Sequence, residues 1–186
     1  ENLEMLSPVS NPQDMPSESI IDLLFPNNPL LCCGVANSAF KTISKVDWGD
    51  SLRKMRLIVP SPMSSKMGFT QSGKPSSHTL SNTGQRRFLV VEFDDGTLDQ
   101  QASIHYRLGT KFPLTLIVFS GSKSLHGWYY VQGLPESHAK KFFNYACSLG
   151  ADRATWTKSQ FVRMPNGVRD NEKKQSVIFF NPKTIK

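Results

Sequence analysis

The stretch Phe88-Leu-Val-Val-Glu-Phe-Asp94 is the strongest structural signal in the chain. Its almost unbroken run of apolar side chains is typical of a central strand that is buried on both faces. Glu92 and Asp94 stand two positions apart where this run ends, so their side chains point to the same face. Two carboxylates placed in this way repel each other unless a cation lies between them, and oxygen ligands suit Mg²⁺ or Mn²⁺. The alternative is a plain strand end that leads into an acidic Asp95-Gly96 turn.

The segments around this strand predict further strands and helices that do not alternate strictly. We therefore expect an α+β fold, with a mixed or antiparallel central sheet and helices packed on it. The expected strands cover residues 55–60, 88–93, 114–119, 126–132 and 176–180, and the expected helices cover 17–24, 98–109 and 135–149.

Composition divides the chain into two parts. Residues 1–16 are rich in Pro, Ser and Asn, which is typical of a loose tail, and we interpret residues 1–50 as an N-terminal tail and accessory segment. Residues 51–186 form the expected main domain, which includes a long Ser/Gly-rich loop at 61–86. The chain begins with Glu1 rather than Met, which suggests a processed chain or a piece of a longer protein.

The charge is unevenly distributed along the chain. Residues 1–40 hold five of the 15 acidic residues and no Lys or Arg, so 22 basic and 10 acidic residues remain in 41–186. A basic body of this kind attracts polyanions, of which nucleic acid is the commonest. The alternative is a basic surface that serves solubility alone.

Other features narrow the setting of the protein. No apolar run approaches the roughly 20 residues needed to cross a bilayer, and no stretch resembles a secretory signal. Cys32, Cys33 and Cys147 form neither a disulfide framework nor a zinc motif. We therefore expect a cytoplasmic protein in a reducing compartment, with no membrane partner.

A second polar cluster follows the strand at 114–119. In Ser120-Gly-Ser-Lys-Ser-Leu-His126, small residues allow backbone amides to approach an anion, while Lys123 and His126 can donate to phosphate oxygens. A P-loop is excluded, because Ser122 precedes Lys123 where that motif requires glycine. The alternative is a flexible hairpin turn with His126 as an ordinary strand residue.

A third cluster lies near the end of the chain. Asp152 comes just after the helix expected at 135–149, where it is either a third carboxylate of the site or a turn residue. Arg163 and Arg169 bracket a Pro-Asn-Gly turn and would present two guanidinium groups on one side of a loop. Arginine suits bidentate phosphate contacts, although surface arginines around a tight turn are the simpler interpretation.

Taken in order, the three clusters resemble the motifs of the archaeo-eukaryotic primase superfamily, most closely those of plasmid and phage replication primases. Glu92-Phe-Asp94 resembles the first motif, Ser124-Leu-His126 the second, and Asp152 the acid of the third, within Gly150-Ala-Asp152 and Arg163-Met-Pro-Asn-Gly167. The resemblance covers roughly residues 88–182. The sequence departs from the family in having Glu rather than Asp at position 92 and Asn166 before Gly167, and Asp170 is an alternative third acid.

The resemblance implies an RNA-recognition-motif-like core and a template-dependent nucleotidyltransferase, a DNA primase or polymerase of a plasmid, phage or mobile element. Glu92, Asp94 and Asp152 would hold two divalent ions, Mg²⁺ or Mn²⁺. The nucleoside triphosphate and the single-stranded DNA template would be the partners, and a helicase region could accompany the domain. The residues expected to contact nucleotide are Lys123, Ser124, His126, Arg163 and Arg169.

Two further expectations remain open at this point. Trp128 and Tyr130 share a strand face with His126 and could stack on a base, although a place in the core is the simpler interpretation. The competing functions are a non-catalytic nucleic-acid-binding module and a metal-dependent nuclease, since carboxylates also serve hydrolysis.

Overall fold

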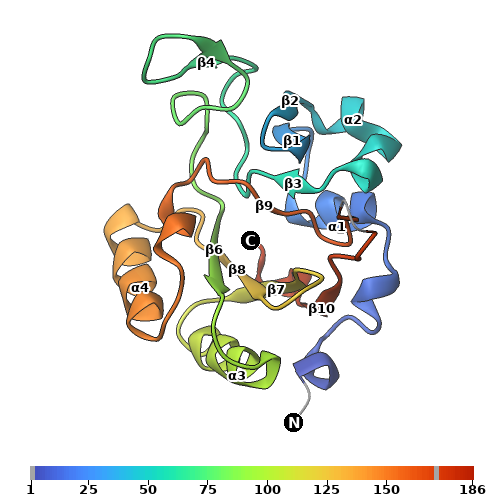
Figure 1. Cartoon of the computed structure of the whole chain (residues 1–186), viewed down its shortest axis with the longest axis vertical. Helices are drawn as coiled ribbons and strands as arrows, with labels where there is room; N and C mark the ends of the chain where they lie inside the picture. Colours follow the sequence, from blue (N-terminus) through green and yellow to red (C-terminus); the bar gives the residue numbers. More distant parts are fainter. Residues whose placement is uncertain (1–2, 170–171) are drawn as a thin grey trace.

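The computed structural model describes residues 3–169 and 172–186, which form two four-stranded sheets and a small two-stranded one (Figure 1). All the strand pairs recorded for these residues are antiparallel. Helices and sheets are mixed, so the α+β prediction is confirmed. None of the helices in these residues has both the length and the apolar character needed to cross a membrane.

The sheet that carries the acids has the strand order β10-β7-β8-β6. With its helices it follows the succession β-α-β-β-α-β of an RNA-recognition-motif-like core. The bounds are β6 (Phe88–Phe93), α3 (Leu98–Gly109), β7 (Leu114–Phe119), β8 (Leu125–Tyr130), α4 (Glu136–Ser148) and β10 (Val177–Phe180).

The prediction that residues 88–93 form a central strand is wrong in one respect. β6 is almost wholly buried, but it lies at the edge of the sheet and pairs only with β8 among the named strands. Its outer edge is covered by the segment after α4, where the Asp152 amide donates to the Glu92 carbonyl oxygen at 2.9 Å. An apolar run reports burial of both faces, and it does not distinguish a covered edge from a central position.

The two faces of this sheet support different cores. Leu89 and Val91 of β6 point toward α3 and α4, where they join an apolar cluster with Phe142 and Phe143. α3 begins with a capping box, in which Thr97 and Gln100 exchange side-chain hydrogen bonds with each other's backbone. The opposite face packs its side chains against α1 (Ser17–Leu24) and the second sheet.

The second sheet, of order β2-β1-β3-β9, was not predicted apart from the segment around β3. Two of its strands come from the N-terminal accessory segment, and their antiparallel pairing has a register shift between Gly34 and Ala36. The bounds are β1 (Leu30–Ala36), β2 (Ala39–Ser44), β3 (Leu57–Ile58) and β9 (Val162–Arg163), with α2 (Lys45–Trp48) and η3 (Gly49–Lys54) between β2 and β3.

The loose tail predicted for residues 1–16 is also wrong over its described part, residues 3–16. Two short 3₁₀ helices, η1 (Leu3–Leu6) and η2 (Pro12–Asp14), pack beside β10. The Val9 amide donates to the Phe180 carbonyl oxygen at 3.2 Å, and Leu3 is buried in the core. Proline and serine disfavour helices and strands, but a few backbone hydrogen bonds and one apolar anchor are enough to dock such a segment.

Residues 61–86 contain only β4 (Gly68–Phe69) and β5 (Pro75–Ser76), and they project from one end of the molecule (Figure 1). Two short 3₁₀ helices complete the description, η4 (Arg153–Trp156) after α4 and η5 (Pro182–Thr184) after β10.

Candidate active site

The three predicted carboxylates lie at one end of β6. Glu92 belongs to the sheet face that looks toward the second sheet, since its neighbour two positions back, Val90, packs in that core. Asp94 follows where the strand ends. Asp152 is placed beside Glu92 by its backbone hydrogen bond to that residue, and its own Oδ1 accepts from the Ala154 amide at 3.0 Å as the N-cap of η4.

The electrostatics of Glu92 record this crowding of acids. Burial, followed by the charges of Asp94 and Asp152, raises the pKa of Glu92 to about 7, against the lowering effects of Arg163 and of a hydrogen bond from Ser124. The ionised form of Glu92 is therefore disfavoured by burial and by the neighbouring acids, and a bound cation would stabilise it.

His126 lies directly across the ladder from Glu92, in the strand that pairs with β6. Its Nε2 is 3.3 Å from Glu92 Oε1, but neither ring nitrogen makes a hydrogen bond within the described residues. Burial, followed by the charge of Arg163, lowers the pKa of His126 to about 3. The imidazole is therefore neutral at pH 7, the contact with Glu92 is no ion pair, and a buried N–H is available to a ligand.

The predicted basic residues surround the acids from two directions. Lys123, in the turn between β7 and β8, places its Nζ 3.5 Å from Asp94 Oδ1 in an exposed ion pair. Arg163, the last residue of β9, has its pKa lowered by burial and by the neighbouring charge of Arg169, against the attraction of Glu92. Arg163 and Arg169 therefore place two positive charges in the space that Glu92 also faces.

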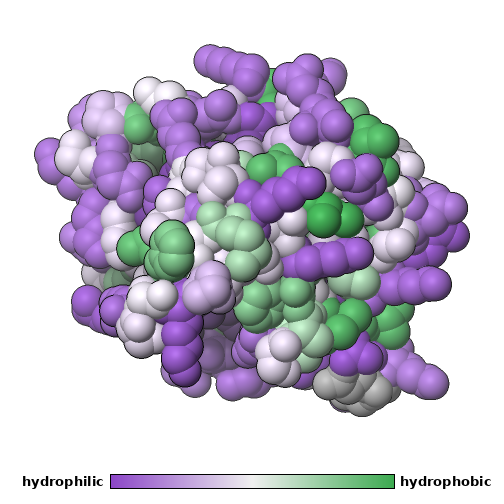
Figure 2. All heavy atoms as spheres, turned by 90° about the horizontal axis from the view of Figure 1, so that it is seen from above, coloured by the Kyte–Doolittle hydropathy of each residue, from purple (hydrophilic) through white to green (hydrophobic). Residues whose placement is uncertain are grey.

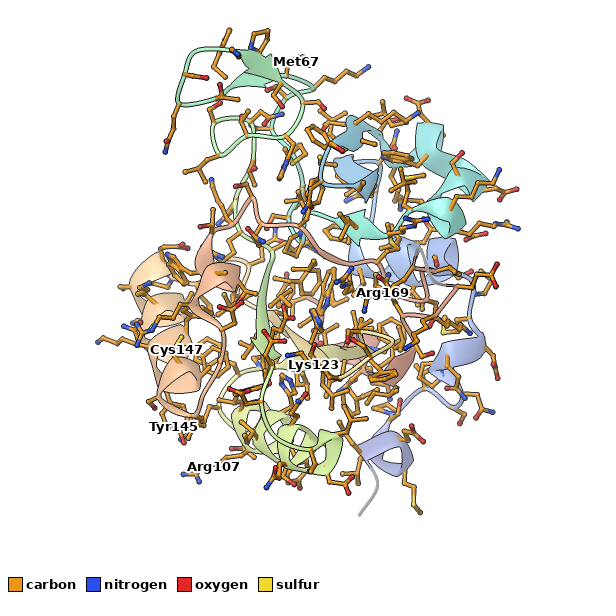
Figure 3. The ribbon with its side chains drawn as sticks, in the orientation of Figure 1. Met67, Arg107, Lys123, Tyr145, Cys147 and Arg169 are labelled. Carbon is orange, nitrogen blue, oxygen red and sulfur yellow. The ribbon has the colours of Figure 1, made fainter. Side chains whose placement is uncertain are left out.

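Arg169 has a structural role as well. Its Nη1 donates to the Ser120 carbonyl oxygen at 3.2 Å and to Ser122 Oγ at 3.1 Å, so it holds the turn that also carries Lys123. Figure 3 labels Lys123 and Arg169 near this turn. Ser124 is buried within the same turn, with its Oγ 3.3 Å from Ser120 Oγ.

A cleft of about 490 Å³ lies between the two sheets. Of the predicted site residues, Glu92, His126, Arg163 and Arg169 line it, whereas Asp94, Asp152, Lys123 and Ser124 do not. Glu92 and His126 line it from the first sheet, and Arg163 lines it from the second. The other residues that line the cleft were not predicted from the sequence, because they belong to no motif and are brought together by pairing between distant strands. These missed lining residues are Val35, Ala36, Asn37, Arg56, Leu57, Gln160, Phe161 and Val162.

Behind the acids, a buried glutamine of α3 joins two turns of the site. Gln101 is fully buried, and its Nε2 donates to the Asp95 carbonyl oxygen at 3.2 Å and to the Lys123 carbonyl oxygen at 3.0 Å. Its Oε1 accepts from the Leu125 amide at 2.8 Å. The turn after Asp94 and the turn before His126 are therefore fixed relative to each other through one side chain.

Trp128 and Tyr130 were expected either to stack on a base or to lie in the core. Trp128 and Tyr130 lie in the core between the sheets, where Trp128 is fully buried, and the Tyr130 hydroxyl donates to the Lys186 carbonyl oxygen. The hypothesis that they stack on a base is therefore wrong, because apolar packing takes their rings. Asp170, the alternative third acid, lies outside the described residues.

The donor chemistry of the site fits a hard divalent cation, although the side chains do not form a closed cage. Within residues 3–169 and 172–186, no group of three or more His, Cys, Asp or Glu side chains is arranged to hold a metal ion. Glu92 offers carboxylate oxygens in the cleft, and Asp94 offers them at the end of the same strand. Among the described residues, Asp152 lies beside Glu92, with its Oδ1 turned to the Ala154 amide.

Comparison with solved structures shows that the chain has the fold of archaeo-eukaryotic primase (AEP) domains. The AEP domain of the primase-polymerase of cyanophage S-2L matches 90% of this chain and 93% of its own length, with a TM-score of 0.57 and 13% sequence identity. The polymerase domain of Ligase D from Mycobacterium tuberculosis, solved in complex with DNA, matches 82% of this chain and 63% of its own, with a TM-score of 0.45 and 14% identity. No protein-family profile matches the sequence, and no curated protein matches it either.

Proposed function

We propose that this chain is a template-dependent nucleotidyltransferase, a DNA primase or polymerase that acts in the replication of a plasmid, phage or mobile element. The observation that carries the proposal is the composition of the cleft. Carboxylates lie at the end of one sheet, and a neutral buried histidine and two arginines face the same space. The shared fold with the cyanophage primase-polymerase domain supports it.

Glu92, Asp94 and Asp152 would hold the divalent ions. When bound, two such ions supply activation of a 3′-hydroxyl and stabilisation of the leaving pyrophosphate. On this side the protein keeps the carboxylates close together and partly buried. This arrangement would stabilise a bound cation, whereas without a cation it favours protonation of Glu92.

The opposite side of the cleft would hold the triphosphate. His126 would donate its free N–H to a phosphate oxygen without adding a charge, because its pKa of about 3 keeps it neutral. Arg163 and Arg169 would each gain from a polyanion that separates their two like charges. Lys123 would give up its exposed ion pair with Asp94 and bind a phosphate. The Ser124 hydroxyl, which lies near Glu92, would donate to a phosphate oxygen as well.

The first test is incorporation of labelled nucleotides on a single-stranded DNA template with Mn²⁺ or Mg²⁺. We expect Asp94→Asn and Glu92→Gln to lose activity by on the order of 100-fold, because each removes a charge that the reaction needs but barely changes shape. His126→Ala should mainly raise the KM for the nucleotide. Asp99→Asn is the matched control, since Asp99 is an exposed acid in the first turn of α3.

The possible outcomes separate the competing functions. Product from the wild type that is lost in Asp94→Asn and kept in Asp99→Asn supports the proposal. Template degradation in place of extension would identify a metal-dependent nuclease. Template binding that survives both acid substitutions, without any incorporation, would identify a nucleic-acid-binding module.

A further inference from the structure

The segment that projects from the molecule lies in a long stretch without acidic residues. Residues 51–91 contain no Asp or Glu and seven basic residues, Arg53, Lys54, Arg56, Lys66, Lys74, Arg86 and Arg87. We use the name lobe for residues 61–86, whose β4 and β5 end projects from the molecule (Figure 1). Its base contacts the second sheet, where Met63 bridges to Leu30 of β1 and the Thr42 hydroxyl of β2 donates to the Ser77 carbonyl oxygen. Of the seven basic residues, Arg86 and Arg87 are buried and Arg53 pairs with Glu18 and Asp50, so the exposed positive charge of the lobe comes from Lys66 and Lys74. Exposed lysines in a segment without acidic residues favour a polyanion.

The lobe exposes large apolar side chains at its outer end. Met67 is 53% exposed and Phe69 is 67% exposed, while Gly68 between them is buried. Phe69 belongs to β4 and Met67 immediately precedes this strand, so two exposed apolar side chains flank the buried Gly68. Lys66 and Lys74 are exposed beside them, and Figure 2, which looks down on this end, shows apolar residues among hydrophilic ones.

The segment that carries Met67 and Phe69 packs against an ordered turn of the lobe. A Cβ added at Gly68 would lie 2.3 Å from Thr79 Oγ1, so the strand presses closely against the turn below it. Asn82 is fully buried in that turn, and its Nδ2 donates to the carbonyl oxygens of Ser65 at 3.1 Å and Ser77 at 3.0 Å. The backbone that carries the exposed side chains is therefore held in place before any partner arrives, which lowers the entropy lost on binding.

The base of the lobe is also continuous with the cleft. The His78 ring lies 3.9 Å from the ring of Phe161, measured between centroids, and Phe161 lines the cleft. The His78 Nε2 is 2.5 Å from the Ser159 carbonyl oxygen, so a second contact holds the two segments together. A strand lying along the lobe would pass directly to the rim of the candidate active site.

We propose that the lobe is a binding surface for single-stranded nucleic acid, with Phe69 and Met67 contacting bases and Lys66 and Lys74 contacting phosphates. Single strands offer unpaired bases that stack on exposed aromatic rings, and their backbone charge is met by lysine. A protein partner with an acidic surface would use the lysines but gives no reason for an aromatic ring held open to solvent. The identification of this strand as the template rests on the proposed function, whereas the binding surface itself does not.

The test is equilibrium binding of a fluorescently labelled thymidine oligonucleotide to the full chain, followed by anisotropy without metal or nucleotide. We expect Phe69→Ala to weaken binding by about 5- to 100-fold, because base stacking on an aromatic ring has that range of effect, and Phe69→Trp to retain it. The double variant Lys66→Ala/Lys74→Ala should reduce the slope of log affinity against log salt by about 1.4, the value for two lost phosphate contacts on a single strand.

Two matched controls test whether the position matters. Tyr106 is a 58% exposed aromatic on α3, at the other end of the molecule, and Lys141 is exposed on α4. Tyr106→Ala and Lys141→Ala should bind the oligonucleotide as the wild type does. Circular dichroism spectra that match the wild type confirm that each variant is folded.

The outcomes of this test and of the incorporation assay differ. If the lobe variants bind the oligonucleotide as tightly as the wild type at every salt concentration, the lobe proposal is overturned and the proposed function stands. If the lobe variants lose binding while the wild type incorporates no nucleotide, the lobe proposal stands and the proposed function fails. Equal loss in the control variants would also overturn the lobe proposal, because binding would then be a property of the whole basic surface.

Discussion

Glu92 shows how much of a site's chemistry is decided by the surroundings of one residue. Its carboxyl group is partly buried beside two other acids, and its nearest ring, that of His126, is neutral. In the absence of a cation, burial and the neighbouring carboxylates therefore make the ionised form of Glu92 unfavourable. This conflict was visible in the sequence only as the spacing of Glu92 and Asp94, because the depth of burial and the approach of Asp152 depend on the fold.

The raised pKa of Glu92 predicts a pH-dependent stability. Its folded pKa of about 7 lies above the usual 4.5, so the folded protein holds a proton that the unfolded chain releases. The resulting stability is full below about pH 4.5 and is lost as the pH rises through about 7. In the presence of EDTA, the wild type should lose about 1–3 kcal/mol of unfolding free energy between about pH 5 and pH 8 relative to Glu92→Gln. Urea denaturation at both pH values measures this, and an equal difference between the two proteins throughout would contradict it.

At the scale of the elements, α3 acts as the support of the site. Gln101 joins the turn after β6 to the turn before β8, and the neighbouring His105 places its Nδ1 2.9 Å from the Tyr129 hydroxyl and its Nε2 3.2 Å from the Leu125 carbonyl oxygen. Both side chains are fully buried under the strand that carries His126. The carboxylates and the histidine therefore keep their relative positions through a helix that contributes nothing to the cleft.

Replacing Gln101 with methionine, which keeps the volume and removes the hydrogen bonds, should loosen these turns. We expect kcat to fall and the Mn²⁺ concentration for half-maximal incorporation to rise by about 10-fold or more, as for other residues that orient metal ligands. Thr115→Val is the control, since it removes a buried hydrogen bond to Thr184 away from the site. If both variants lower activity in proportion to their stability and leave the Mn²⁺ dependence unchanged, Gln101 has no positioning role.

Local patterns predicted some elements and not others. The bounds expected for 88–93, 98–109 and 114–119 match β6, α3 and β7, because each has a continuous apolar run or a capped, periodic pattern. β3 and β9 have two residues each, and β1 reads Leu-Leu-Cys-Cys-Gly, so this sheet depends on pairing between distant segments. The same holds for the residues of the site. Glu92 and His126 belong to sequence motifs, whereas Val35 and Arg56, which line the cleft, do not.

At the scale of the whole molecule, the two sheets are joined by a connection that also binds the N-terminal segment. β9 belongs to one sheet and β10 to the other, and Asn166 lies between them with a positive φ of 56°. Its Nδ2 donates to the carbonyl oxygens of Pro12 and Met15, both at 2.8 Å, while its Oδ1 accepts from the Val177 amide at 2.8 Å. The departure from the primase pattern at this position thus has a structural reason.

Asn166 should therefore be a determinant of stability. Asn166→Ala loses three hydrogen bonds and places a Cβ-bearing residue in the left-handed region, so we expect a loss of about 3–5 kcal/mol of unfolding free energy. Asn166→Gly should recover about 1 kcal/mol of this, since glycine adopts that backbone freely. Asn27→Ala, at an exposed asparagine with a φ of 64°, measures the backbone contribution by itself. Urea denaturation gives all three values, and a loss at Asn166→Ala no larger than at Asn27→Ala would disprove the role of the side chain.

The hydrogen bond between Val9 and Phe180 has a consequence for biosynthesis. Residues 3–16 are synthesised before the strand they cover, which is complete only when residue 180 has been added. Until then this segment has no edge to dock on, and β7 lacks its neighbour on that side. Contacts so far apart in sequence form late in folding, so the nascent chain exposes β-pairing edges that chaperones would be needed to shield until β10 emerges.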